Sequence, residues 1–389
     1  MPASYRAGTY IISSVAGEEC RAFIPRPLPP DPPLSLSVED YDLMEKANRA
    51  LGRLDGLATL LPDTSLFLYF FVRKEAVLSS QIEGTQSSIA DLLLYESAET
   101  PGTPLDDVEE VSGYVAALRF GLERLNGGFP LSLRLLREIH QVLLSTGRGS
   151  SKSPGEFRRS QNWIGGTHPG NARFIPPPPE KLMDCLSEFE KFLHNDPVRT
   201  PVLLKAALSH VQFETIHPFL DGNGRLGRLL IALLLYSEGA LSEPILYLSL
   251  FFKQNRDAYY DLLQRVRTEG DWESWIRFFL TGVLETAEQS VRTARAILQL
   301  FEDDRQRIRA LNRQAAAALQ VHQYLQNRPL TSIQSAGAAL GLTLPTVTTA
   351  LTNLVKLGIV QEMTGRRRNR LFRYSAYLKI LEEGTEPLR

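Results

Sequence analysis

The chain has 389 residues, which exceeds the size at which one hydrophobic core usually stops growing, so at least two folding units are expected. Its 43 Lys and Arg residues balance 44 Asp and Glu residues, which argues against a protein that coats nucleic acid or lies on a membrane surface. Two cysteines cannot form a disulfide framework, and neither a signal sequence nor a membrane-spanning apolar run is evident. We therefore expect a soluble cytoplasmic protein without membrane contacts.

The pattern of prolines, apolar residues and charges divides the chain into four predicted regions. Six prolines within nine positions, from Pro25 to Pro33, predict an extended N-terminal arm because proline lacks the backbone donor that helices and sheets need. Apolar residues then recur at helical spacing, starting at a cap-like Ser37-x-x-Asp40 pair. The predicted regions are an arm at 1–36, a helical region at 37–105, a core at 106–300 and a separate module at 301–389.

One stretch of the middle region is clearly not helical, FRRSQNWIGGTHPGNARFIPPPP. Two short apolar and aromatic segments flank a turn rich in Gly, Pro and Asn, which predicts a β-hairpin. The predicted fold class is therefore mainly α, a helical bundle with one β-hairpin.

The C-terminal segment has a different character. Between Val321 and Tyr374 it holds seven Lys or Arg residues and a single acidic residue, Glu362. The stretch LTSIQSAGAALGLTLPTVTTALTNLVKLG predicts two helices, with Thr343 as N-cap and Pro345 in the first turn of the second. Two strands around a basic turn follow, and this order of elements predicts a winged helix-turn-helix domain.

The twelve residues HPFLDGNGRLGR, from His217 to Arg228, combine several kinds of chemistry. Two glycines around Asn223 let the backbone approach a ligand, and the N–H groups at the start of the next helix form its positive end. Arg225 and Arg228 lie three residues apart on that first turn, where guanidinium groups suit phosphate oxygens. Asp221 is then placed as a Mg²⁺ ligand, because Mg²⁺ typically takes one or two carboxylates together with substrate phosphates.

His217 lies four residues before this aspartate, at the end of a predicted helix. An isolated histidine is more often structural, and a Gly-Asn-Gly turn alone is an ordinary loop. Beside an immobilised phosphate, however, a histidine is placed to take the proton from an attacking hydroxyl. The motif as a whole predicts a metal-assisted phosphate site with a base.

The same twelve residues resemble the signature of the Fic family, HxFx(D/E)GNGRxxR, with every specified position matched. The resemblance extends from about Leu28 to Leu284, so it covers most of the chain. It implies a Fic-type helical bundle, with residues 106–300 as its catalytic core. It also implies a protein adenylyltransferase, which moves AMP from ATP to a Ser, Thr or Tyr hydroxyl of a target protein, or of itself, and releases pyrophosphate.

The resemblance also implies roles for single residues. His217 would be the general base, Phe219 an anchor for the loop and Asp221 the Mg²⁺ ligand. Arg225 would contact the β-phosphate and Arg228 the γ-phosphate, while the glycine turn would hold the α- and β-phosphates. The predicted ATP-binding set of the motif is Gly222, Asn223, Gly224, Arg225, Leu226, Gly227 and Arg228.

In the Fic family a β-hairpin flap covers the active site and binds the target as an added strand. The predicted hairpin resembles this flap, and unpaired strand edges suit recognition of a backbone. The flap residues predicted to meet the target are Trp163, Ile164, Gly165, Gly166 and Thr167. Further on, NRDAYYDLLQR resembles the family's stretch near the adenine, with Tyr260 as the first candidate and Tyr259 and Asn255 as others.

A further motif, SSQIEG, spans residues 79–84. Ser79 and Glu83 are one helical turn apart and Gly84, a residue type that commonly closes helices, follows. Alone, this spacing is typical of a solvated helix face, but it matches the Fic inhibitory pattern (S/T)xxxE(G/N). The resemblance implies that Glu83 pairs with Arg228 in place of the γ-phosphate. In some family members the same glutamate activates water to remove AMP, so a reverse reaction stays open.

Two alternatives remain open at this point. A related enzyme would transfer a different phosphate-containing group, since the motif does not select the base. A DNA-binding regulator would instead use the winged helix, with residues 344–357 in the major groove and the Fic region as a nucleotide sensor. Winged helices also dock proteins, and family members often form homodimers. The predicted phosphate contacts to DNA are Arg366, Arg367, Arg368 and Arg370.

Overall fold

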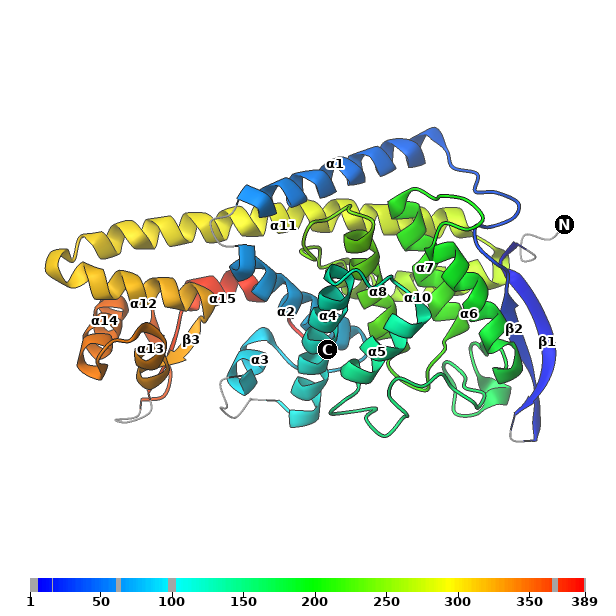
Figure 1. Cartoon of the computed structure of the whole chain (residues 1–389), viewed down its shortest axis with the longest axis horizontal. Helices are drawn as coiled ribbons and strands as arrows, with labels where there is room; N and C mark the ends of the chain where they lie inside the picture. The colour runs from blue at the N-terminus through cyan, green and yellow to red at the C-terminus, as the bar shows by residue number, and fades with distance from the viewer. Residues whose placement is uncertain (1–5, 16, 61–63, 97–102, 366–369, 388–389) are drawn as a thin grey trace.

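The computed structural model describes residues 6–15, 17–60, 64–96, 103–365 and 370–387, and there the chain is mainly helical (Figure 1). The strands are β1 Gly8–Val15, β2 Glu18–Pro25, β3 Leu330–Ser332, β4 Gln361–Glu362 and β5 Leu371–Arg373. The helices are α1 Val38–Leu60, α2 Thr64–Ile82, α3 Ile89–Glu96, α4 Leu105–Asn126, α5 Leu133–Leu143, α6 Pro179–Leu193, α7 Val202–Ile216, α8 Asn223–Ser237, α9 Ser249–Gln254, α10 Arg256–Glu269, α11 Trp272–Arg309, α12 Ala315–Asn327, α13 Ile333–Leu340, α14 Leu344–Lys356 and α15 Ser375–Glu382. Short 3-10 turns lie at η2 Pro169–Asn171 and η3 Asn312–Gln314.

The N-terminal region contains a hairpin where the sequence predicted an extended arm. β1 and β2 pair antiparallel, with Gly8 opposite Pro25, so the prediction for residues 1–36 is wrong over this stretch. The residues before Pro25 include a run of β-branched and aromatic side chains, which favour strands, and the prolines begin only where β2 ends. The proline-rich segment after β2 has neither helix nor strand, as predicted.

α1 begins at the cap predicted from the sequence. Ser37 Oγ accepts a hydrogen bond from Asp40 N at 3.2 Å, and Asp40 Oδ2 accepts one from Ser37 N at 3.0 Å. Asp40 Oδ1 also accepts from Arg277 Nε of α11 at 2.8 Å. This ion pair joins α1 to α11, and Figure 1 shows α1 lying along part of α11.

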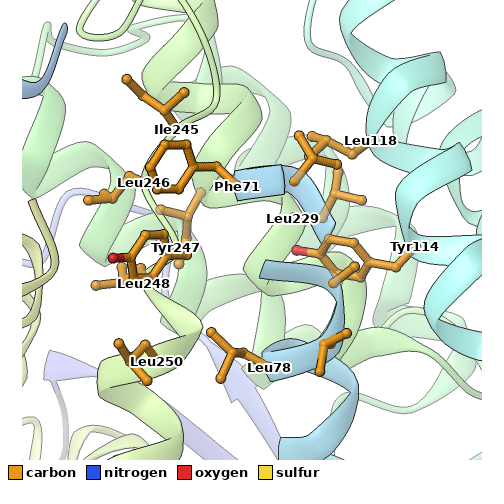
Figure 2. Packing of buried hydrophobic residues seen from close by; sticks show 14 of the residues in the cluster. Phe71, Leu78, Tyr114, Leu118, Leu229, Ile245, Leu246, Tyr247, Leu248 and Leu250 are labelled. Atoms are coloured by element: carbon orange, nitrogen blue, oxygen red, sulfur yellow. The ribbon is translucent and has the colours of Figure 1, made fainter. Parts of the chain in front are cut away.

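α2 is built into the hydrophobic core. In Figure 2, Phe71 and Leu78 of α2 lie between side chains of α4 and α8 on one side and of residues 245–250 on the other. Phe71 stacks on Tyr247 with ring centroids 5.5 Å apart. Burying one such side chain stabilises a fold by about 1.5–3 kcal/mol, so moving the whole helix would be costly. The turn after Ile82, which carries Glu83, lies outside the helix and is the part that can move at lower cost.

α7 and α8 form the centre of the bundle and frame the motif. Every residue of α7 from Leu203 to Ile216 is buried, and α8 packs against it. The inward face of α8 carries leucines at helical spacing, Leu226, Leu229, Leu230 and Leu233, and each is at most 1% exposed. The loop at 217–222 therefore joins two buried helices.

The C-terminal segment is joined to the bundle by α11. This helix runs without a break through residue 300, where a boundary was predicted, so the two predicted regions share it. α12, α13 and α14 follow, with a three-stranded sheet of order β3-β5-β4. Thr343 Oγ1 accepts from Thr346 N at 3.4 Å at the start of α14, and Pro345 lies in its first turn, as predicted. Arg366, Arg367 and Arg368 lie outside the described residues.

No single helix in the described ranges is long and apolar enough to cross a membrane. α13 and α14 together reach the required length and composition, but they meet at 116°.

Candidate active site

The predicted base lies where α7 ends. His217 has the left-handed angles φ 50° and ψ 61°, and its N–H donates to Phe213 O at 2.9 Å. Arg158, which is 3% exposed, donates from Nε to His217 O and from its backbone N to Pro218 O, both at 2.9 Å. These bonds fix the backbone on both sides of His217 and therefore the direction of its ring.

The ring of His217 is in a state that accepts a proton. Burial lowers its pKa to about 3, and the guanidinium groups of Arg267 and Arg158 add to this. The imidazole is therefore neutral near pH 7, as a general base must be. Its Nδ1 is buried and has no hydrogen-bond partner among the described side chains and backbone.

Asn223 holds the loop in shape through both ends of its amide. Its Oδ1 accepts from Phe219 N and its Nδ2 donates to Phe219 O, each at 2.9 Å. Asn162 Nδ2 donates to the same carbonyl at 3.0 Å. The side chain of Asn223 is thus used within the protein, and only its backbone N–H is left to face a ligand.

His140 of α5 packs against the loop at 217–222, and no sequence pattern predicted this role. Its ring stacks on Phe219, with centroids 3.7 Å apart and planes at 10°. Nδ1 accepts from Gly155 N at 2.8 Å, so the proton lies on Nε2, which donates to Asp221 O at 3.0 Å. Burial lowers the pKa of His140 to about 4, which keeps this neutral tautomer at pH 7.

The start of α8 forms an anion site of backbone donors. Gly222 takes a left-handed φ of 74°, and the helix begins at the next residue. The N–H groups of Asn223, Gly224 and Arg225 have no acceptor within the helix, because its first turn offers none. They lie at the positive end of the helix dipole, as the motif predicted.

Asp221 lies at the rim of this site and is partly exposed. Its Oδ1 accepts from Gly222 N at 2.6 Å and approaches Arg225 Nη2 at 3.4 Å, while Oδ2 accepts no hydrogen bond from the described residues. No group of three or more His, Cys, Asp or Glu side chains that could hold a metal is present among the residues that the structure describes. A cation here would rest on one carboxylate and on ligand phosphates, which fits Mg²⁺.

Arg225 is buried at the base of the site, 1% exposed. Its Nη1 lies 3.2 Å from Glu110 Oε1 of α4, but the pair does not have hydrogen-bond geometry, and Arg225 Nε and Nη1 have no partner within the described chain. Glu110 also lies 3.4 Å from Arg148. A buried guanidinium with unused donors is ready to bind an anion.

Arg228 donates three hydrogen bonds to the predicted inhibitory motif. Its Nε donates to Ser79 Oγ at 2.8 Å, and its Nη2 donates to Ser79 O at 3.0 Å and to Glu83 Oε1 at 2.7 Å. Arg228 is 3% exposed and its bonds to Ser79 are buried, whereas the Glu83 side chain is 30% exposed and its bond is only partly shielded from water. Ser79 and Glu83 therefore occupy the face of Arg228 that a γ-phosphate would need.

The charge balance of this pair favours the ionised carboxylate. Burial alone would raise the pKa of Glu83, but Arg228 and, farther away, Arg225 hold it below its usual value. Glu83 also lies over the glycine turn, since a Cβ on Gly224 would come within 2.3 Å of its Oε1. A negative charge therefore covers the start of α8, where phosphates would bind.

The residues predicted near the adenine differ in accessibility. Tyr259 is 1% exposed, and its hydroxyl bonds to His210 Nε2 at 2.8 Å, so it belongs to the core. Asn255 donates to Phe251 O at 3.0 Å within the α9–α10 junction. Tyr260 is partly exposed and has the Arg256 guanidinium 5.3 Å from its ring centre, which leaves it the best placed of the three. Leu226 is fully buried, and its N–H donates to Gly222 O at 3.0 Å within the helix.

The predicted flap is a loop rather than a regular hairpin. Its two sides meet only at a bridge between Ile164 and Phe174, so the predicted pair of strands is not present. Gly165 and Gly166 have positive φ angles on one side, and four prolines from Pro176 remove backbone donors on the other, which keeps the ladder from extending. Trp163 is 37% exposed, and Thr167 N donates to Asn171 Oδ1 at 2.9 Å.

β2 takes part in holding this flap segment. Phe23 N donates to Ile175 O at 2.9 Å, and Glu18 accepts from Gly170 N at 3.1 Å and contacts His168 Nδ1 at 2.9 Å. The N-terminal hairpin thus holds the flap segment through one backbone hydrogen bond and the side chain of Glu18.

Comparison with family models assigns the two halves of the site to two neighbouring domains. Residues 41–123 match the model described as Fic/DOC family N-terminal, and residues 130–235 match that of the Fic/DOC family. The chain therefore contains a Fic/DOC family N-terminal domain followed by a Fic/DOC family domain. Ser79 and Glu83 lie in the N-terminal match and the motif from His217 to Arg228 lies in the Fic match, so the ion pair joins the two domains.

Curated relatives of the Fic chain carry the name Protein adenylyltransferase Fic. The protein of Culex quinquefasciatus is 35% identical over 252 residues, which cover 62% of this chain and 46% of the relative. The Drosophila melanogaster protein is 32% identical over 201 residues, covering 51% and 37%. This chain thus spans less than half the length of the curated relatives it matches.

Solved structures show the Fic fold. A Fic family protein from Desulfovibrio desulfuricans G20 superposes with a TM-score of 0.57 at 19% identity, covering 88% of this chain and 97% of that one. Fic-1 of C. elegans gives a TM-score of 0.51 at 23% identity, covering 66% and 74%. At these identities the likeness concerns the fold alone.

Proposed function

We propose that this Fic protein transfers AMP from ATP to a hydroxyl side chain of a target protein. One observation carries the proposal: a neutral, backbone-fixed His217 lies beside a helix start whose N–H groups and buried Arg225 are arranged for phosphates. The relatives named as protein adenylyltransferases support the same chemistry. The target protein binds along the segment from Trp163 to Thr167.

In the proposed reaction His217 removes the proton from the target hydroxyl. The oxygen attacks the α-phosphorus, the bond from that phosphorus to the bridging oxygen breaks, and pyrophosphate leaves with the bonding electrons. The N–H groups at the start of α8 bind the phosphate oxygens, and Arg225 holds the charge of the leaving group. Mg²⁺ bound at Asp221 would neutralise further phosphate charge. Phe219, clamped by Asn223 and His140, keeps the base in line with these donors.

We also propose that the chain is autoinhibited as it stands. Glu83 and Ser79 use the donors of Arg228 that a γ-phosphate requires, and Glu83 brings a negative charge of its own. ATP then binds without the correct placement of its α-phosphate.

The position of the label decides whether AMP is the group transferred. With ATP labelled at the α-phosphate, we expect label on the protein, and with γ-labelled ATP we expect none, because the γ-phosphate leaves in pyrophosphate. The Glu83→Gly variant is the enzyme to use, with EDTA as the metal-free control. A panel of α-labelled nucleotides then tests the base. Label from the γ-phosphate would instead identify a phosphotransferase.

A second proposed function concerns the C-terminal segment, which we assign as a winged helix that binds DNA. α13 and α14 meet at 116°, β3 precedes α13, and β4 and β5 follow α14 as an antiparallel pair, which is the order expected of a winged helix. α14 leaves Thr349, Thr352 and Lys356 exposed on its outer face. Arg370, beside Phe372, is the described member of the predicted basic turn.

Salt dependence tests this assignment. We expect the full chain to bind duplex DNA with an affinity that falls steeply with salt, by about one decade per decade of salt for each phosphate neutralised. Replacing Lys356 and Arg370 together should reduce that slope, as measured by fluorescence anisotropy. A binding constant that does not change with salt would favour the protein-docking alternative.

A further inference from the structure

The C-terminal end of the chain returns to the helix that carries the inhibitory motif. α15 packs on α2, α3 and α11, and Figure 1 shows it in red beside α2. Tyr377 of α15 meets Phe70 of α2 edge to face, with ring centroids 5.0 Å apart. The segment after α15 then reaches the turn at the end of α2.

Gln81 makes the contact to this tail from inside the inhibitory motif. It lies between Ser79 and Glu83 and is fully buried. Its Nε2 donates to Ser87 O at 2.9 Å and to Thr385 O at 2.8 Å, which uses both hydrogens of the amide. Thr385 is 2% exposed, so the second bond is closed to water.

Lys253 of α9 holds the tail from a second side. Its Nζ donates to Gly384 O at 3.1 Å and to Glu386 O. Gly384 has a φ of 79°, and a Cβ there would come within 2.7 Å of Leu250 Cδ1, so the tail lies directly against α9. Because α9 packs on α2, the tail fills a place bounded by both helices.

We propose that the tail, defined as Gly384–Glu386, is a second inhibitory element that holds the turn of α2 in the conformation in which Glu83 pairs with Arg228. When the tail leaves, Gln81 loses the acceptor for a buried donor, and the turn that carries Glu83 loosens. A ligand of the segment α12–α15 that draws α15 away from α2 therefore releases Arg228 for ATP. The effect on activity rests on the proposed AMP transfer, whereas the effect on the turn does not.

Two variants and one matched control test this coupling. A chain ending at Glu383 removes the tail, and a chain ending at Pro387 is the matched control that keeps it. Gln81→Met, which has a similar volume but no amide, tests the same contact without shortening the chain. Each is measured by hydrogen–deuterium exchange of residues 79–84 and by self-modification with α-labelled ATP.

In the Glu383-ending chain and in Gln81→Met we expect both exchange and labelling to rise about fivefold or more, the effect of losing a buried hydrogen bond of ordinary strength. Neither change should raise labelling further in the Glu83→Gly background, because all three changes act through Arg228. If neither readout changes while Glu83→Gly is active, the tail is not an inhibitory element. If exchange rises but no variant, Glu83→Gly included, accepts label, the coupling holds and the proposed AMP transfer is wrong.

Discussion

Replacing His217 with alanine is expected to lower AMP transfer about 100- to 10,000-fold in the Glu83→Gly background, the usual contribution of a positioned general base. The phosphate-binding groups stay in place, because Arg225 and the start of α8 depend on Asn223, His140 and Glu110 rather than on the imidazole. ATP binding should therefore persist while the rate falls. The measurement is the initial rate of label transfer from α-labelled ATP, together with nucleotide binding by calorimetry.

Two control variants separate loss of the base from loss of the fold. His217 has a φ of 50°, which asparagine adopts more readily than alanine, so His217→Asn should be inactive with an unchanged melting temperature. His194→Ala changes an exposed histidine at the end of α6 and should retain full activity. A His217→Asn enzyme that keeps a tenth of the rate or more would show that another group accepts the proton.

The arrangement of the motif residues was predictable because they are neighbours in the sequence. A helix end, a glycine turn and the start of α8 fall within HPFLDGNGRLGR, so backbone geometry alone brings His217, Asp221 and Arg225 together. The helical periodicity of α8 also gave its buried face correctly. Local chemistry and local geometry coincide in such a motif, and no long-range pairing has to be known.

The supporting residues could not be predicted for the opposite reason. His140, Arg158 and Glu110 come from segments well before the motif, and a single polar residue in a helix or loop does not indicate what it will contact. The pair of Arg228 with Glu83 joins residues 145 positions apart, and only the resemblance to the Fic inhibitory pattern related them. Physical arguments from spacing left Glu83 on a solvated helix face.

Two predictions about strands were wrong, one in the N-terminal region and one in the flap segment. Proline density between Pro25 and Pro33 was extended backward over β1 and β2, although strand-forming residues precede it. In the flap segment, apolar and aromatic residues predicted two strands. Gly165 and Gly166 on one side and the prolines from Pro176 on the other allow only one bridge there. β2 contacts this region through the hydrogen bond from Phe23 N to Ile175 O, and neither segment alone indicates that contact.

Replacing Glu83 with glycine is expected to raise self-modification about 10- to 100-fold over the unchanged chain. A hydrogen bond between charged groups contributes about 1.5–3 kcal/mol, and its loss shifts the competition for Arg228 toward ATP by a corresponding factor. The substitution costs little in stability, because Glu83 lies in the turn after α2 and not within the helix. It also removes the carboxylate from above Gly224, where phosphates would bind.

Glu83→Gln separates the charge from the contact. The amide keeps an oxygen that accepts from Arg228 Nη2 but carries no charge, so we expect a rate between those of the unchanged chain and Glu83→Gly. Ser79→Ala removes the other side-chain acceptor, at 2.8 Å from Arg228 Nε, and should activate less, because the carbonyl of residue 79 still accepts from Nη2 at 3.0 Å. The order Glu83→Gly above Glu83→Gln above the unchanged chain, measured as label from α-labelled ATP at saturating Mg²⁺, follows from the ion pair. Equal rates in all three would mean that ATP displaces Glu83 without cost, and Arg228 would then not be the point of control.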